Sequence, residues 1–264
     1  MTIPFYKFDG AGNDFVVVDN REGRYSLTDN EVARICHRRF GVGADGLMTL
    51  DSASDGYDFT MRYYNSDGHL GSMCGNGGRC IAMLASLLGM GQSLRFMGYD
   101  GPHAAQIEQW DDERRCGVVR LGMHDVSKGE MRQVEGGCFL DTGSPHYVLE
   151  VQGLADYDVV GQGRRWRQRT DLFPQGANID FVERHADGRL NMRTYERGVE
   201  DETLACGTGV TAVALVMGQH HDIHTRGGAV FSVDYNESDH AFTDINLIGP
   251  VSLNFTGTWI SSAR

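Results

Sequence analysis

Residues 73 to 85 read MCGNGGRCIAMLA, and residues 205 to 216 read ACGTGVTAVALV. Each stretch places a cysteine before a Gly-x-Gly triplet and then continues as an apolar run. Glycine is unfavourable inside a helix but is tolerated where a helix begins. We therefore predict that Cys74 and Cys206 each lie at the start of a helix. Because both runs are apolar on nearly every face, we expect both helices to be buried.

Four further pairs of segments match in the same order, about 130 residues apart, which indicates an internal duplication. We predict an α+β fold of two pseudo-symmetric domains, each a mostly antiparallel β-sheet or barrel wrapped around one central helix. The expected domains are 1–113, with 253–264 returning to it, and 114–252, with the active site in the cleft between them. The matching segments are GNDFVVVD (from Gly12) with SPHYVLEV (from Ser144), GADGLMTL (Gly43) with GANIDFVE (Gly176), FTMRYYNSDG (Phe59) with LNMRTYERG (Leu190), and, more weakly, LRFMGYDG (Leu94) with AVFSVDYN (Ala229).

Local signals add detail to the first half. Short β-rich segments at 15–19, 47–51 and 57–64 alternate with turn clusters, which is typical of strands. The stretch LTDNEVARICHRRFG predicts a further helix. Thr28 is its expected N-cap, Glu31 completes a capping box, and Gly41 is the expected stop.

Composition limits the classes of partner. The 264-residue chain carries a net charge of −12, which disfavours nucleic acid as a ligand. No run approaches the ~18 apolar residues of a spanning helix, and the start, MTIPFYKFDGAGNDF, does not look like a signal peptide. We therefore expect a cytoplasmic protein with no membrane partner. Its six cysteines should then be reduced, and none forms a C-x-x-C pair that would suggest zinc or a redox motif.

Two matched thiols suit proton transfer on the two faces of one carbon. A helix N-terminus favours the thiolate form of a cysteine placed there. One thiolate would remove the α-proton of an amino acid, and the opposite thiol would donate a proton to the other face. Backbone N–H groups would stabilise the carbanion through the α-carboxylate, so that neither a metal nor a pyridoxal cofactor is needed. The expected donors are the amides of Gly75, Asn76, Gly207 and Thr208.

Other polar residues follow apolar segments or lie in glycine-rich turns around these motifs. Arg197 is suited to hold a carboxylate by two hydrogen bonds, and His146 to polarise a thiol. Taken singly, each of these residues is as compatible with a turn, a solvated ion pair or a structural role. The remaining candidates for substrate binding are Asn13, Asn65, Asn178 and Glu196.

Several alternatives stay open. The two cysteines are also compatible with ordinary packing, or with a disulfide that would be an oxidised, inactive form. The function is also compatible with a racemase or epimerase of another amino acid such as proline or hydroxyproline, with a ligand-binding protein that kept the fold, or with a Cys–His hydrolase or transferase. A hydrolase needs only one nucleophile, so the second matched cysteine argues against it.

Three other patterns are weak. GVGADG from Gly41 fits a dinucleotide fingerprint, but a helix precedes it and a strand follows, which is the wrong order. HHDIH at 220–224 has possible metal spacing, but it lies at an expected helix end, where the dipole favours His, and no further acidic or thiol partner is placed with it. RRWRQR from Arg164 is interpreted as a solvated helix face.

The sequence resembles the diaminopimelate epimerase family over essentially its whole length. The motifs that carry the resemblance are GAGNDF, YYNSDG followed by MCGNGGRC, SPHYV, FPQGANIDFV and YERGVEDETLACGTG. The resemblance implies conversion of LL-diaminopimelate to the meso form in lysine and peptidoglycan precursor synthesis, by a dimeric enzyme whose two-domain cleft closes on substrate. It implies Cys74 and Cys206 as the acid/base pair and His146 and Glu196 as residues that tune the thiols. The implied substrate contacts are Asn13, Asn65, Gly75, Asn76, Asn178, Glu196, Arg197, Gly207 and Thr208.

Two positions depart from the family pattern. The family often has Gln where this chain has Gly46, and Asn where it has Ser144. Both usual residues contact substrate, so these two contacts are in doubt here.

Overall fold

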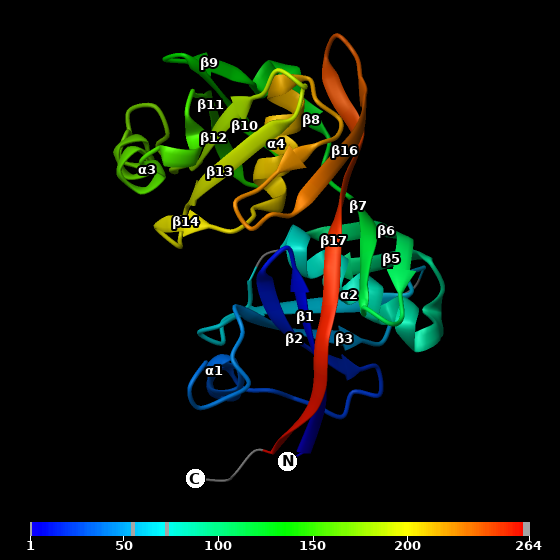
Figure 1. The fold of residues 1–264 in the computed structure, drawn as a ribbon. Helices are drawn as coiled ribbons and strands as arrows, with labels where there is room; N and C mark the ends of the chain where they lie inside the picture. Colours follow the sequence, from blue (N-terminus) through cyan, green and yellow to red (C-terminus); the bar gives the residue numbers. More distant parts are fainter. Residues whose placement is uncertain (1, 54–55, 72–73, 261–264) are drawn as a thin grey trace. The chain divides into compact units, whose positions relative to one another are not determined.

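The computed structural model describes residues 2–53, 56–71 and 74–260. The chain forms two compact units, one that runs to Leu121 and resumes at Pro250, and one from Gly122 to Gly249. The ribbon shows strands gathered about one helix in each unit, α2 in the first and α4 in the second (Figure 1).

The sheet of the first unit closes on itself. The pairs β1–β2, β3–β4, β5–β6 and β6–β7 are antiparallel, whereas β2–β3 and β4–β5 are parallel. β17 pairs with both β1 and β7, which completes the ring. Its strands are β1 (Thr2–Gly10), β2 (Asn13–Asn20), β3 (Gly46–Asp51), β4 (Phe59–Asn65), β5 (Ser93–Gly98), β6 (Gly101–Asp111), β7 (Cys116–Gly122) and the end of β17 (Ala241–Ile260).

The second unit repeats this succession of pairings. β10–β11 is antiparallel, β11–β12 parallel, β12–β13 antiparallel, β13–β15 parallel, and β15–β16 and β16–β17 antiparallel. The predicted duplication and the α+β fold class are therefore confirmed. Its strands are β8 (Val126–Ser127), β9 (Arg132–Val134), β10 (Gly137–Asp141), β11 (Pro145–Glu150), β12 (Asn178–Arg184), β13 (Leu190–Glu196), β14 (Asp201–Thr203), β15 (Ile223–His224) and β16 (Val230–Glu237).

The two central helices are α2 (Gly75–Ala85) and α4 (Gly207–Met217), of 11 residues each. α2 packs on β1, β2, β3 and β6, and α4 packs on β10 to β13 and on β16. Both helices are buried on nearly every face, as the apolar runs predict. Cys80 is fully buried in α2, and burial raises the pKa of its thiol, which agrees with a packing role. A short π-helical segment, η1 (Ser86–Met90), follows α2.

The capping box of α1 (Asp29–Cys36) is confirmed, because Thr28 accepts from the Glu31 N–H and the Glu31 side chain accepts from the Thr28 N–H. The predicted stop at Gly41 is wrong. The chain leaves the helix at His37, which has extended backbone angles, and then folds back. The amides of 42–44 donate to the Ile35 and Cys36 carbonyls, which satisfies the last carbonyls of the helix. The helix therefore ends at Cys36, five residues before Gly41.

The other helical segments are α3 (Val159–Arg167) and two 3-10 turns, η2 (Lys128–Glu130) and η3 (Leu154–Asp156). The RRWRQR run begins in α3, and both Arg164 and Arg165 are exposed there, as expected for a solvated face. The predicted strands at 15–19, 47–51 and 57–64 correspond to β2, β3 and β4. Among the described residues, no helix has the length and apolar character needed to span a membrane.

Candidate active site

Cys74 and Cys206 occupy equivalent backbone positions, one in each unit. Each is the N-cap residue of its central helix, with φ/ψ of −108°/119° for Cys74 and −120°/115° for Cys206. Neither side chain makes a capping hydrogen bond. The first helical bonds run from Gly78 N–H to the Cys74 carbonyl and from Val210 N–H to the Cys206 carbonyl. The N–H groups of the residues before Gly78 and Val210 therefore take no part in the i to i−4 hydrogen bonds of these helices. Such N–H groups at a helix start are where helices bind anions.

In the first unit, an amide oxygen joins two predicted site residues. The Cys74 Sγ donates to Asn13 Oδ1 at 3.6 Å, and Asn76 Nδ2 donates to the same oxygen at 3.4 Å. Asn13 begins β2, while Cys74 and Asn76 belong to the start of α2. Gly10 permits this approach, because a Cβ there would lie 2.8 Å from the Asn76 carbonyl oxygen. Residues predicted from two separate motifs, GAGNDF and MCGNGGRC, thus share one cluster.

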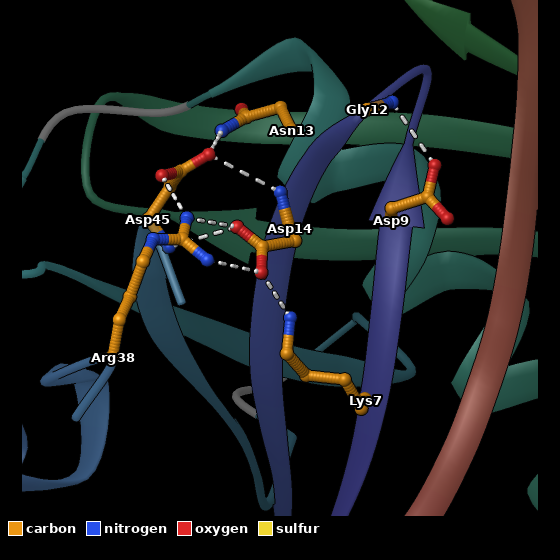
Figure 2. Close-up of polar contacts among 7 residues, drawn as sticks. All are labelled: Lys7, Asp9, Gly12, Asn13, Asp14, Arg38 and Asp45. Atoms are coloured by element: carbon orange, nitrogen blue, oxygen red, sulfur yellow. Dashed lines mark hydrogen bonds and ion pairs between the residues drawn. The ribbon is translucent and has the colours of Figure 1, made fainter. Parts of the chain in front are cut away.

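A network of charged side chains orients the side-chain amide of Asn13 (Figure 2). Asn13 Nδ2 donates to Asp45 Oδ2 at 2.8 Å, and Arg38 binds both Asp45 and Asp14. Lys7, which is buried, also pairs with Asp14. Burial opposes ionisation of Asp14, but the bonds from Arg38 and Lys7 prevail and lower its pKa to about 2. Because Asp45 accepts from the nitrogen, the Asn13 oxygen is the atom that faces Cys74.

Arg79 supports the same turn from inside α2. Its side chain is fully buried, and its Nη2 donates to Asn76 Oδ1 at 2.9 Å and its Nη1 to the Gly75 carbonyl at 3.2 Å. Burial lowers the pKa of this guanidinium to about 10, so it stays charged at neutral pH. The bond to Asn76 Oδ1 turns the Asn76 nitrogen toward Asn13.

In the second unit, a chain of side chains leads from a buried carboxylate to the thiol. Asp180 Oδ2 lies 2.6 Å from His146 Nδ1, and His146 Nε2 lies 2.8 Å from Thr208 Oγ1. The Thr208 hydroxyl in turn lies 3.4 Å from Cys206 Sγ. Thr194 completes the chain by donating to Asp180 Oδ1 at 2.7 Å. His146 of SPHYV is therefore brought together with Cys206 and Thr208 of ACGTG.

His146 is charged because of this environment. Burial alone would lower the pKa of the imidazole, but the Asp180 carboxylate overcomes that effect and raises it well above the ordinary 6.5. His146 and Asp180 both have side chains with no exposed surface. A buried ion pair is tolerated when its remaining hydrogen-bonding atoms are satisfied, as Thr194 and Thr208 satisfy them here.

Asn178 lies beside this series of hydrogen-bonded side chains and bonds to three further residues. Its Nδ2 donates to Ser144 Oγ at 2.9 Å and to the Pro145 carbonyl at 3.1 Å, and its Oδ1 accepts from the Arg197 N–H at 2.8 Å. Ser144, which departs from the family pattern, thus bonds to a predicted site residue.

The other predicted site residues lie at strand ends or on the surface of their unit. Asn65 is exposed at the end of β4, and Glu196 is half-buried at the end of β13, with its carbonyl accepting from the Glu200 N–H. The Arg197 guanidinium is exposed and donates to the Gln175 carbonyl at 3.1 Å. At Gly46, a Cβ would lie 2.5 Å from the Tyr63 ring, so Tyr63 occupies the space a larger residue would need.

The residues that sequence reasoning missed are the charged and hydroxyl groups behind the predicted ones. Asp180 lies in the strand NIDFVER, whose first five residues are buried, and an acidic residue with no exposed surface there signals a buried partner. Asp45 lies in GVGADG, the stretch that does not fit a dinucleotide fingerprint. The other missed residues are Lys7, Asp14, Arg38, Arg79 and Thr194.

No group of three or more His, Cys, Asp or Glu side chains that could hold a metal occurs in the part of the chain that the structure describes. His220 instead bonds to the Val233 carbonyl and stacks on Tyr235. None of the six cysteines, which all lie in the described part of the chain, forms a disulfide.

The fold is shared with solved structures of low sequence identity to this chain. A hydroxyproline epimerase of Agrobacterium vitis superposes with a TM-score of 0.67 at 13% identity, covering 98% of this chain and 91% of that chain. A phenazine biosynthesis protein of Bacillus anthracis superposes with a TM-score of 0.67 at 16% identity, covering 99% and 100%. These likenesses establish the fold class and leave the family to be decided by sequence.

Sequence comparison decides the family. A family model described as diaminopimelate epimerase matches residues 5–124 and 138–246. The diaminopimelate epimerase of Chlorobaculum tepidum is 42% identical over 262 residues, covering 94% of this chain and 98% of the relative. That of Flavobacterium psychrophilum is 40% identical over 263 residues, covering 96% and 98%. The chain belongs to the diaminopimelate epimerase family, which confirms the resemblance seen in its motifs.

Proposed function

We propose that this chain is a cofactor-independent epimerase that converts LL-diaminopimelate to meso-diaminopimelate with two cysteines. The observation that carries the proposal is the pair of thiols on matching N-caps of two buried helices, in a member of this family. Cys74 and Cys206 are its acid/base pair, acting on opposite faces of one α-carbon.

The helix starts supply the stabilisation that this chemistry needs. An α-amino acid C–H is a weak acid, so the carbanion must be stabilised as it forms. The amides of Gly75 and Asn76, and of Gly207 and Thr208, precede their helical ladders and are suited to bind the α-carboxylate. Preorganised N–H donors of this kind typically lower the activation barrier by about 2.7–4 kcal/mol each.

The polar residues around the thiols divide into two tasks. His146 and Glu196 tune the thiols. Asn13, Asn65, Asn178, Glu196 and Arg197 bind the charged groups of the substrate, together with the helix amides. Support comes from the contacts of Asn13 with Cys74 and of Asn178 with the Arg197 backbone.

Incubation of reduced protein with LL-diaminopimelate in deuterated water tests the function. Deuterium should enter the α-position as the meso form appears, after treatment with a chelator and without pyridoxal phosphate. Absence of both exchange and epimerisation would refute the proposal. Turnover of proline or hydroxyproline in place of diaminopimelate would assign the chain to the alternative epimerases.

Single replacements test the two-base scheme. Cys74→Ser and Cys206→Ser should each lower kcat by at least about 100-fold, the lower end of what general acid–base groups contribute. Full activity in either variant would exclude the scheme. Cys80→Ser is the matched control, because Cys80 lies in the same helix as a packing residue.

We further propose that the enzyme acts as a cytoplasmic homodimer in lysine and peptidoglycan precursor biosynthesis. The family resemblance supports this setting, and the acidic composition argues against nucleic acid as a partner. Light scattering on the purified protein tests the dimer directly.

A further inference from the structure

The two thiols are held by hydrogen bonds of opposite direction, and charged side chains set both directions: Asp45, which is exposed, in the first unit and Asp180, which is buried, in the second. In the first unit, Asp45 takes the Asn13 nitrogen, so the Asn13 oxygen faces Cys74. An amide oxygen only accepts hydrogen bonds, so Cys74 is the donor and carries its proton. Arg79 reinforces this arrangement, because it turns the Asn76 nitrogen toward the same oxygen.

In the second unit the direction is reversed. The Asp180 carboxylate accepts from His146 Nδ1–H, and the charged imidazole then has an Nε2–H, which faces Thr208 Oγ1 at 2.8 Å and Asn178 Nδ2 at 3.3 Å. Asn178 Nδ2 is a donor and already bonds to Ser144 Oγ and the Pro145 carbonyl, so the Thr208 oxygen accepts this hydrogen. With its oxygen occupied as an acceptor, the Thr208 hydroxyl directs its own hydrogen to the Cys206 sulfur, 3.4 Å away. Cys206 is then a hydrogen-bond acceptor, which suits a thiolate.

We propose that Asp180 is a positioning residue that, through His146 and Thr208, makes Cys206 the proton-abstracting thiolate of the free enzyme, with Cys74 as the thiol. The inference rests on the proposed function for its role in turnover. In the first half-reaction the Cys206 thiolate takes the α-proton, and the C–H electron pair stays on carbon. Cys74 then gives its S–H proton to the opposite face of that carbon and becomes the thiolate.

The internal repeat supports a device confined to the second unit. Aligning GADGLMTL with GANIDFVE places Leu47 opposite Asp180, and aligning GNDFVVVD with SPHYVLEV places Asp14 opposite His146. Leu47 is fully buried in the first unit and cannot serve as a carboxylate partner. The ionisable groups that act on His146 are Asp180 on β12 and Cys206 at the start of α4.

Thiol alkylation followed by mass spectrometry tests the assignment without turnover. Iodoacetamide reacts with thiolates, so the rate at each cysteine is measured as a function of pH in free enzyme. We expect the rate at Cys206 to reach its plateau at lower pH than the rate at Cys74. The pH at the half-maximal rate is the readout, because it is independent of the lower accessibility of Cys206. A lower half-maximal pH at Cys74 would overturn the proposal.

Asp180→Asn is the decisive variant, since it keeps the shape of the side chain and removes its charge. It should move the Cys206 profile to higher pH, lower the Cys206 rate at pH 7 about 10-fold or more, and leave the Cys74 profile in place. The matched control is Asp45→Asn, which removes one carboxylate from the other unit and should leave the Cys206 profile unchanged. An unchanged Cys206 profile in Asp180→Asn refutes the proposal.

Two further measurements separate positioning from a structural role. In ¹⁵N-histidine NMR spectra at pH 8, His146 should be an imidazolium in the wild type and neutral in Asp180→Asn; a charged His146 in the variant contradicts the proposal. Adding Asp180→Asn to a His146→Gln variant should change the Cys206 profile no further, and an additional shift would show that Asp180 does not act through His146. If Asp180→Asn fails to fold, Thr194→Val, which leaves Asp180 Oδ1 without its donor, should give a smaller shift in the same direction, and no shift would refute the proposal.

Discussion

Matching glycines in the two central helices offer a direct test of how tightly the second half-site is packed. Gly77 and Gly209 are both the third residue of their helix, and both are buried. At Gly209, an added Cβ would lie 2.7 Å from Asp180 Oδ1 and 3.3 Å from His146 Cε1. At Gly77, the nearest atom would be Met48 Sδ at 2.9 Å. The same substitution, to Ala, therefore meets a fixed carboxylate in one unit and a flexible thioether in the other.

The expected free energies follow from these contacts. Ala is favoured over Gly in a helix by up to about 1 kcal/mol, and this gain is common to both variants. Met48 can adjust its side chain, so Gly77→Ala should leave the free energy of unfolding unchanged or raise it slightly. Asp180 is held by His146 and Thr194 and cannot withdraw, so overpacking should cost about 1–3 kcal/mol. Gly209→Ala should therefore be less stable than Gly77→Ala by about 1–3 kcal/mol.

Urea denaturation of both variants, followed by circular dichroism, measures this difference. Because the chain has two units, the unfolding transition of each unit should be compared separately between each variant and the wild type. In the same preparations, Gly209→Ala should lower kcat, since it displaces the groups that direct Thr208 toward Cys206. Equal destabilisation by the two substitutions, or a Gly209→Ala protein more stable than the wild type, would refute the reasoning.

Three other predictions concern stability. Thr28→Ala should lower the free energy of unfolding by about 1 kcal/mol in urea denaturation, because it removes the acceptor for the Glu31 N–H; no change would mean that the capping box is not needed. The pKa of Asp14 is lowered to about 2 from 3.8, so its stabilisation is present above pH 3.8 and is lost as the pH falls toward 2; Arg38→Gln should reduce this acid sensitivity, measured as urea midpoints at pH 5 and 3. The pKa of His146 is raised above 6.5, so its stabilisation is complete below pH 6.5 and is lost as the pH rises through the raised value; urea midpoints at pH 6 and 9 should converge in Asp180→Asn, and a wild-type slope in that variant would contradict the sign.

The duplication was readable from the sequence because it is carried by local patterns. A cysteine, two glycines and an apolar run occupy adjacent positions, so one alignment of the chain with itself predicts both helix starts. The N-caps at Cys74 and Cys206 and the burial of both helices follow directly. The helix of residues 29–36 was predicted at its start, where Thr28 and Glu31 are three residues apart. Its end depends on the fold-back of 42–44, which no local pattern reveals.

The charged residues behind the thiols could not be predicted in the same way. Asp180 has its partners 34 residues before it, at His146, and 14 residues after it, at Thr194. Strand pairing brings them together, since β12 lies between β11 and β13. Without that pairing, the sequence shows only an acid between two apolar residues, Ile179 and Phe181. The same holds for Asn13, whose orientation depends on Asp45, the residue just before the next strand of the sheet.

A duplicated fold meets one requirement of a two-base epimerase, the matching positions of two thiols, but conflicts with another, their different protonation states. Repetition gives two thiols the same backbone position and the same helix amides, which suits attack on two faces of one carbon. Identical surroundings would also give both thiols the same protonation state, and a two-base reaction needs one to be a thiolate while the other holds a proton. The halves differ where this requirement acts, since an amide oxygen faces Cys74 and a hydroxyl linked to an imidazolium faces Cys206. The departures from symmetry around the thiols therefore carry as much of the proposed mechanism as the symmetry itself.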